Sequence, residues 1–101
     1  MVANIKDDRL EIKLVRDVTA SWVEDKLDQV RGIMNRNKSY EEVVVGMEKV
    51  EIIDSIGISF IIAIYKTARE LGKGFKVIGL NEEVKNLFKM MRLDEVFNVR
   101  F

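Results

Sequence analysis

The sequence predicts an α/β sandwich, in which a mixed, mostly parallel sheet of four to five strands carries about three main helices. The first observation is the order of apolar patterns along the chain, which reads strand, strand, helix, strand, helix, strand, helix. The second is that this order requires crossover connections, which bring strands parallel. The third is size: 101 residues with 48% hydrophobic content suffice for one core. We therefore expect a single domain over residues 1–101.

The first half of the chain predicts a hairpin followed by a helix. Residues 10–15 alternate apolar and charged side chains, as in a half-buried strand, and 2-VANIK-6 can pair with them antiparallel across the polar KDDR connection. From Thr19, a plausible N-cap, apolar residues recur every three or four positions up to the polar segment 35-NRNKS-39. We expect one helix here, with its core stripe formed by Ala20, Val23, Leu27, Val30 and Met34.

The second half predicts two buried strands and two more helices. The run 43-VVVGM-47 is typical of a central strand covered on both faces, and 75-FKVIGL-80 of another buried strand. A helix from about Ser55 to Leu71 should end at Gly72 and Gly74. Asn81 should cap the last helix, and 96-VFNVRF-101 can add a short edge strand. The core stripe expected for the last helix is Val84, Leu87, Phe88 and Met91, with Met90 and Met91 filling gaps in the core.

Composition excludes several functions. The chain has no cysteine and no histidine, so it lacks thiolate metal sites, Cys-His or Ser-His-Asp catalysis and the commonest metal ligand. Seventeen basic and seventeen acidic residues alternate instead of clustering, which argues against nucleic acid as a partner. No P-loop or dinucleotide fingerprint is present. We expect no enzyme activity and no cofactor. The charged start and short apolar runs predict no membrane insertion and a cytoplasmic location.

Asp54 and Ser55 interrupt the apolar segment 49-KVEIIDSIGISFIIAIYK-66. They fall between a strand and a helix, at the edge of the sheet where α/β folds place ligand and partner sites. Aspartate and serine are also favoured N-caps, so one of them can simply satisfy the first turn. The residues alone leave both interpretations open.

The helix that follows has two faces. At 100° per residue, a broad apolar arc should face the core, formed by Ile56, Gly57, Phe60, Ile61, Ile64, Ala68 and Leu71. Ser55, Ser59, Ile62 and Lys66 fall on the opposite side, which is compatible with a docking face or with a solvated one. Trp22 lies off the stripe of the first helix, so it is either a partly exposed anchor for a partner or packed at the helix edge.

Residues 49–97 resemble the STAS domain family, in particular bacterial anti-sigma factor antagonists. The family pattern is an apolar strand, Asp-Ser-x-Gly-[Leu/Ile], a helix, a glycine-rich break, a strand, and a final helix with a Val-x-x-Leu-Phe-like motif followed by Leu-x-x-[Val/Ile]-Phe. The matching residues are Asp54, Ser55, Gly57, Ile58, Gly72, Gly74, Val84, Leu87, Phe88, Leu93, Val96 and Phe97. The resemblance implies a STAS-like (SpoIIAA-like) sandwich.

The resemblance also implies a function. In this family the serine after the aspartate accepts phosphate from an anti-sigma factor that is itself a serine kinase, which gives that role to Ser55. The unphosphorylated protein binds the anti-sigma factor and frees the sigma factor for transcription, phosphorylation ends binding, and a separate phosphatase reverses it. ATP belongs to the kinase. The expected partner surface comprises Thr19, Trp22, Asp54, Ser55, Ile56, Ser59, Ile62 and Lys66.

The chain departs from the family pattern at two places near this surface. It reads 16-RDVT-19 where many members have Gly-x-Leu-Asp, and Ile56 stands where many relatives have serine, threonine or alanine. A second interpretation therefore stays open, that of a scaffold STAS protein of the stressosome type or the cytoplasmic STAS subunit of a membrane transporter. In that case Ser55 is only a cap and the protein forms a homo-oligomer, such as a homodimer, or a hetero-oligomer.

Overall fold

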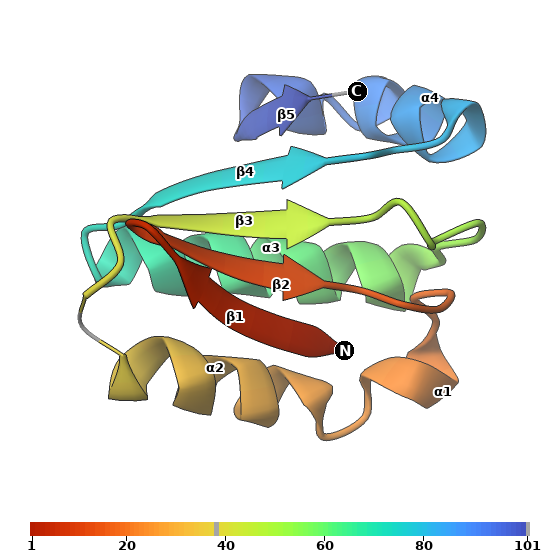
Figure 1. The fold of residues 1–101 in the computed structure, drawn as a ribbon. Helices are drawn as coiled ribbons and strands as arrows, with labels where there is room; N and C mark the ends of the chain where they lie inside the picture. The colour runs from red at the N-terminus through yellow and green to blue at the C-terminus, as the bar shows by residue number, and fades with distance from the viewer. Residues whose placement is uncertain (38, 101) are drawn as a thin grey trace.

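Five strands form one mixed sheet in the order β1-β2-β3-β4-β5 (Figure 1). The computed structural model describes residues 1–37 and 39–100, with side chains as far as Phe97. The strands are β1 (Val2–Lys6), β2 (Arg9–Lys13), β3 (Glu42–Gly46), β4 (Gly74–Ile78) and β5 (Asn98–Arg100). Only β1 and β2 pair antiparallel, whereas β2 to β5 are parallel, which confirms the predicted mixed sheet, hairpin and final edge strand. Phe101, the end of the predicted edge strand, lies outside the described residues.

Helical crossovers connect the parallel strands. The helices are α1 (Ala20–Val23), α2 (Lys26–Arg36), α3 (Ser55–Glu70) and α4 (Glu82–Met90), followed by the 3-10 helix η1 (Leu93–Glu95). Helix α3 ends as expected, because Gly72 adopts a φ of +71° that favours glycine and the N–H of Lys73 donates to the carbonyl of Ala68 at 2.9 Å. Asn81 caps α4 through its Oδ1, which accepts from the N–H of Val84 at 2.8 Å.

The single helix expected from Thr19 is wrong, because the structure breaks it into α1 and α2. Asp25 has a φ of +66°, which ends one helix and starts the next in a new direction. In one continuous helix Trp22 would point roughly 80° away from Val30, since eight residues turn the helix by about 800°. The break lets both side chains enter the core, while Ala20 becomes exposed.

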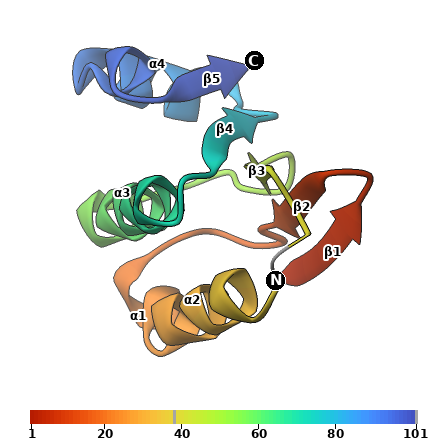
Figure 2. The same cartoon turned by 90° about the vertical axis from the view of Figure 1, so that its left-hand side faces the viewer.

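The helices cover only one face of the sheet (Figure 2). The core-facing strand residues are Leu10, Ile12, Val43, Val45, Phe75 and Val77. Residues 43–47 are all buried, as expected of a strand covered on both faces, although helices supply the cover on one face alone. Val44 points to the other face and is nevertheless buried, because it lies in a hollow lined by the long side chains of Glu11, Lys13 and Glu48. A continuous apolar strand thus needs no second helical layer.

The buried arc of α3 differs from the predicted one at its first turn. Ile56 was expected in the core but is 48% exposed, whereas Ile58 is buried. Ile56 instead borders a groove between α3 and the α1–α2 segment, where Val23 and Leu27 lie opposite. The rest of the predicted arc packs inward, apart from Leu71, which is half-buried beyond the helix end.

An aromatic cluster closes the C-terminal part of the core. The ring of Phe97 lies 5.2 Å from that of Phe75, 5.3 Å from Tyr65 and 6.1 Å from Phe88, centroid to centroid. The expectation that Met90 and Met91 fill the core is wrong, since they are 81% and 46% exposed. Because α4 ends at Met90, the chain turns there, and Leu93 and Phe97 are buried in place of the two methionines.

Candidate functional site

Three loops meet at the carboxyl ends of β2, β3 and β4, and they hold the segment before α3 in place. The Asp17 carboxylate oxygen Oδ1 accepts from the N–H groups of Glu51 and Ile52, both at 3.0 Å. The Asn81 side-chain amide donates to the carbonyls of Val50 and Glu51 at 3.2 Å. Eight residues separate β3 from α3, and these bonds fix their course so that residues 54 and 55 stand at the edge of the sheet.

Asp54 caps two helices at once. One carboxylate oxygen, Oδ1, accepts from the N–H of Gly57 in the first turn of α3 at 2.7 Å, and the other, Oδ2, accepts from the N–H of Ala20 at the start of α1 at 2.9 Å. Thr19 occupies the N-cap position of α1, but its side chain makes no capping bond. We call the place where residues 54–57 meet Thr19 and Ala20 the corner, and Asp54 is the residue that positions it. The expectation that Ser55 could be the cap is wrong.

The same contacts set the acidity of Asp54. Hydrogen bonds from the backbone N–H of Gly57 and then of Ala20 stabilise the carboxylate, so the pKa of Asp54 lies below its ordinary value. The group therefore stays ionised at neutral pH, and it gives the corner a fixed negative charge beside the positive end of the α3 dipole.

We expect Asp54→Asn to be less stable than the native chain at neutral pH, because an amide offers one acceptor oxygen to two N–H donors. The folded pKa is lower than the unfolded one, so the carboxylate contributes stability above the unfolded pKa and loses it as pH falls through the folded pKa. Urea unfolding at pH 7 and near pH 3 should show the gap between the two proteins narrowing in acid. The exposed Glu41→Gln serves as the matched control, and a gap independent of pH would contradict the assignment.

Ser55 is the first residue of α3 and is exposed. Its backbone carbonyl accepts from the hydroxyl of Ser59 at 3.1 Å, while no described residue forms a hydrogen bond with its own hydroxyl. The first-turn N–H of Gly57 is already bound to Asp54. The Ser55 side chain thus stands exposed on the first turn of a helix and not on a loop.

The other residues of the expected surface are partly brought together. Thr19 adjoins the corner through the bond between Ala20 and Asp54, and Ile56 and Ser59 are exposed beside Ser55. Ile62 and Lys66 lie further along the same helix, with Lys66 about 16 Å from Ser55 at 1.5 Å per residue.

Trp22 does not form part of the exposed surface. It is only 8% exposed, and its ring meets that of Phe60 edge-on at 5.6 Å. Of the two interpretations that the sequence left open, packing is the correct one and the exposed anchor is wrong. Trp22 supports the surface from beneath, by fixing α1 against α3.

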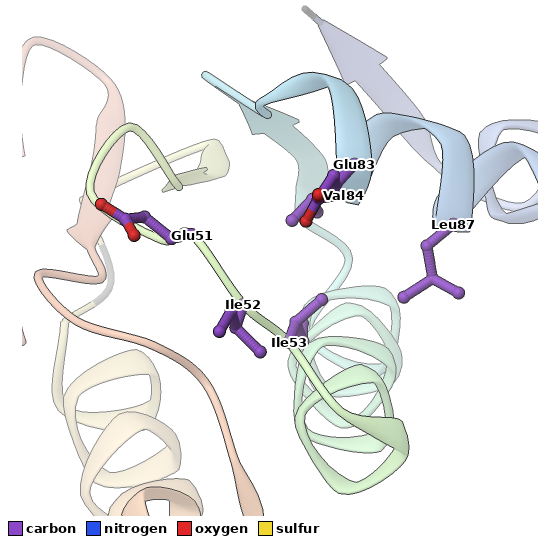
Figure 3. Close-up of a pocket in the computed structure, with 6 residues that line it drawn as sticks. All are labelled: Glu51, Ile52, Ile53, Glu83, Val84 and Leu87. Carbon is purple, nitrogen blue, oxygen red and sulfur yellow. The ribbon is translucent and has the colours of Figure 1, made fainter.

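The sequence missed Ile52, which is 57% exposed on the other side of Asp54 and Ser55. It borders a hollow of about 170 Å³ between the segment before α3 and helix α4, shown in Figure 3. The residues that line this hollow are Glu51, Ile52, Ile53, Glu83, Val84 and Leu87. The sequence pattern does not separate Ile52 from its buried neighbour Ile53, because the contacts that hold this segment, such as the β-bridge between Ile53 and Val18, join distant parts of the chain.

The described residues contain no group of three or more carboxylates that could hold a metal ion. Within the same residues, no helix has both the length and the apolar character needed to cross a membrane. The candidate site thus consists of a capped helix start, an exposed serine hydroxyl and two exposed isoleucines, Ile52 and Ile56.

Comparison with known proteins places this arrangement in a family. A protein of Thermotoga neapolitana, named as a candidate anti-sigma factor antagonist and homolog of TM1081, is 29% identical over 63 residues. That match covers 62% of this chain and 56% of the relative, so the chain spans less than two thirds of the relative's length. The crystal structure of TM1081 from Thermotoga maritima superposes with a TM-score of 0.89 at 21% identity, over 99% of this chain and 85% of that one.

More distant structures share the fold. The anti-sigma factor antagonist SpoIIAA in its unphosphorylated form has a TM-score of 0.68 at 10% identity, over 94% of this chain and 96% of that one. A stressosome structure and the STAS domain of a Vibrio cholerae SulP transporter also superpose, with TM-scores of 0.76 and 0.80. The family model of the STAS domain matches residues 8–100, nearly the whole chain. This chain therefore belongs to the STAS domain family.

Proposed function

We propose that this chain is an anti-sigma factor antagonist that is switched off by phosphorylation of Ser55. The observation that carries the proposal is that Asp54 uses both carboxylate oxygens to cap α3 and α1, while the hydroxyl of the neighbouring Ser55 stays exposed. Ile52 and Ile56 flank that hydroxyl with exposed apolar surface, as a protein partner would require. The partner is a serine kinase that acts as an anti-sigma factor, and a phosphatase restores binding.

The reaction is phosphoryl transfer in which the kinase supplies ATP and the catalytic groups. The Ser55 Oγ forms a bond to the γ-phosphorus, the bond from that phosphorus to the bridging oxygen of ADP breaks, and the hydroxyl proton passes to a base on the kinase. The product carries about −1.5 to −2 charges beside the Asp54 carboxylate. Since Asp54 already occupies the N–H of Gly57, the phosphate cannot bind there without displacing the cap. It therefore changes the surface and leaves the fold intact.

The test is incubation with the cognate kinase and ATP, followed by intact-mass measurement. We expect the native chain to gain one phosphate, Ser55→Ala to gain none, and Ser39→Ala to behave like the native chain. Ser39 is the matched control because it is an exposed serine outside the expected partner surface. Phosphate on the Ser55→Ala protein, or its loss from Ser39→Ala, would refute the assignment.

A constitutive scaffold, of the stressosome or transporter type, is the second proposal. It is favoured by Arg16 and Thr19, which replace the glycine and aspartate of the Gly-x-Leu-Asp pattern next to the corner. Size-exclusion chromatography of the native chain and of Ser55→Asp separates the proposals. A scaffold assembles equally in both forms, whereas a switched antagonist loses its complex with the kinase in the Ser55→Asp form. The free energy of unfolding of that form should stay within about 0.5 kcal/mol of the native value.

A further inference from the structure

A long groove runs between α2 and α3 on the outer side of the helical layer. Two adjoining hollows form it, and they share Ser59 and Ala63. In Figures 1 and 2 the two helices lie side by side along their lengths. From Ile56 to Glu70 the groove follows α3 for about 21 Å, at 1.5 Å per residue. We name this feature the α2–α3 groove.

The two ends of the α2–α3 groove differ in chemistry. Near Ser55 the lining is apolar, with Val23 and Leu27 facing Ile56 and Phe60 across a hollow of about 360 Å³. At the far end Arg31, Lys66 and Glu70 line the second hollow, which gives it a positive excess. The groove is therefore apolar where a partner would meet the corner and basic about three turns away.

At the basic end of the α2–α3 groove, hydrogen bonds hold Arg31 in a position from which it can bind an anion. The Nε of Arg31 donates to the hydroxyl of Thr67 at 3.3 Å, and that hydroxyl donates to the carbonyl of Ala63 at 2.9 Å. This pair of bonds holds the guanidinium across the groove, with its remaining N–H groups available. Among the described residues, no carboxylate lies within 4 Å of Arg31 or Lys66 in an ion pair. A carboxylate from a partner would complete the arrangement.

The lining also selects the backbone conformation of the occupant. Helices α2 and α3 use their backbone N–H and C=O groups internally, so the groove offers no hydrogen-bond ladder to an extended peptide. A helix satisfies its own backbone and presents side chains at i, i+3, i+4 and i+7 to a groove of this shape. About four turns fit the length from Ile56 to Glu70.

We infer that the α2–α3 groove binds an amphipathic helix of a protein partner, with apolar anchors near Ser55 and acidic side chains at the Arg31 and Lys66 end. This inference rests on the proposed function for the link to Ser55 and names the partner chemistry of that surface. A phosphate on Ser55 lies beside Ile56, where the apolar anchors sit, and about 16 Å from Lys66. That distance exceeds the Debye length of about 8 Å, so the phosphate opposes the helix through desolvation at the apolar end more than through repulsion of its acidic end.

The test uses synthetic helical peptides of about 15 residues, which match the groove length. One carries leucines at i, i+3, i+4 and i+7 and glutamates on the same face beyond them, and its counterpart has lysines in place of the glutamates. Titration is followed by amide chemical shifts in nuclear magnetic resonance and by the fluorescence of Trp22, the sole tryptophan, which packs on the groove residue Phe60. We expect the acidic peptide to bind about tenfold more tightly at low salt.

Matched variants separate the two ends. Arg31→Glu with Lys66→Glu should reverse the preference, so that the lysine peptide binds more tightly than the acidic one, and raising the salt should shrink the difference. Lys6→Glu, on the hairpin, should change nothing. Ser55→Asp should weaken both peptides about equally, with little dependence on salt.

Shifts confined to α2 and α3 support the inference. Equal binding of both peptides, shifts at the sheet edges, or concentration-dependent self-association that blocks the groove would overturn it. Peptide binding that Ser55→Asp leaves unchanged would refute the switch and retain the groove. Phosphorylation of Ser55 by the kinase, in a protein that binds neither peptide, would support the switch and refute the groove.

Discussion

Replacing Gly57 with alanine is expected to lower the free energy of unfolding by about 3 kcal/mol or more. A Cβ at this position would lie 2.0 Å from the carbonyl oxygen of Val18 and 2.9 Å from its carbonyl carbon, and backbone atoms cannot rotate away. Alanine gains about 1 kcal/mol in helix propensity over glycine, which is too little to offset such a clash. Urea unfolding of the native and variant proteins measures the difference.

The effect should reach the functional corner. The close approach of Gly57 to Val18 is what brings the start of α3 against the chain that enters α1, so that Asp54 can bond to both Gly57 and Ala20. Gly74→Ala is the matched control, because a Cβ there meets its nearest atom at 3.5 Å, an ordinary contact. We expect that variant to stay within about 1 kcal/mol of native stability. Equal losses for the two variants would show that the clash at Val18 is not the cause.

The second large effect is expected for Phe97→Ala, with a loss of about 3 kcal/mol in the free energy of unfolding. Phe97 is 5% exposed and contacts the rings of Phe75, Tyr65 and Phe88, so its removal leaves a cavity where β4, α3 and α4 meet. Denaturant unfolding followed by circular dichroism gives the measurement.

The neighbouring Val96→Ala provides the control for Phe97→Ala. Val96 is 50% exposed, so its truncation should cost less than about 0.5 kcal/mol. A small effect at Phe97 would mean that the C-terminal segment adds little to the core, and the ring cluster would then be of no consequence for stability.

Much of the fold follows from local patterns. The alternation in residues 10–15, the apolar run at 43–47 and the turn signals at Gly72 and Asn81 predicted the strands, the helix ends and the mixed sheet correctly. These features depend on neighbours along the chain, which hydrophobic periodicity and capping chemistry report directly. The Asp-Ser-x-Gly pattern also led to the family that the whole-chain match supports.

The wrong predictions concern which side of an element meets the rest of the molecule. Ile56 and Met91 share apolar character with the buried Ile58 and Phe88, and only the packing of α1, α2 and the C-terminal segment separates them. Trp22 could enter the core only after Asp25 broke the helix, and a single left-handed residue carries little signal in the sequence.

By itself, the sequence determined the order of elements, the sheet type, the absence of histidine and cysteine chemistry, and the pairing of Asp54 with Ser55 at a helix start. Only the tertiary structure decided what each member of that pair does. The bond from Ala20 to Asp54 joins residues 34 positions apart, and it consumes the second oxygen of the carboxylate. Because each oxygen of the Asp54 carboxylate accepts a backbone N–H at a different helix start, Asp54 holds the two helices together, and the neighbouring Ser55 side chain stays exposed.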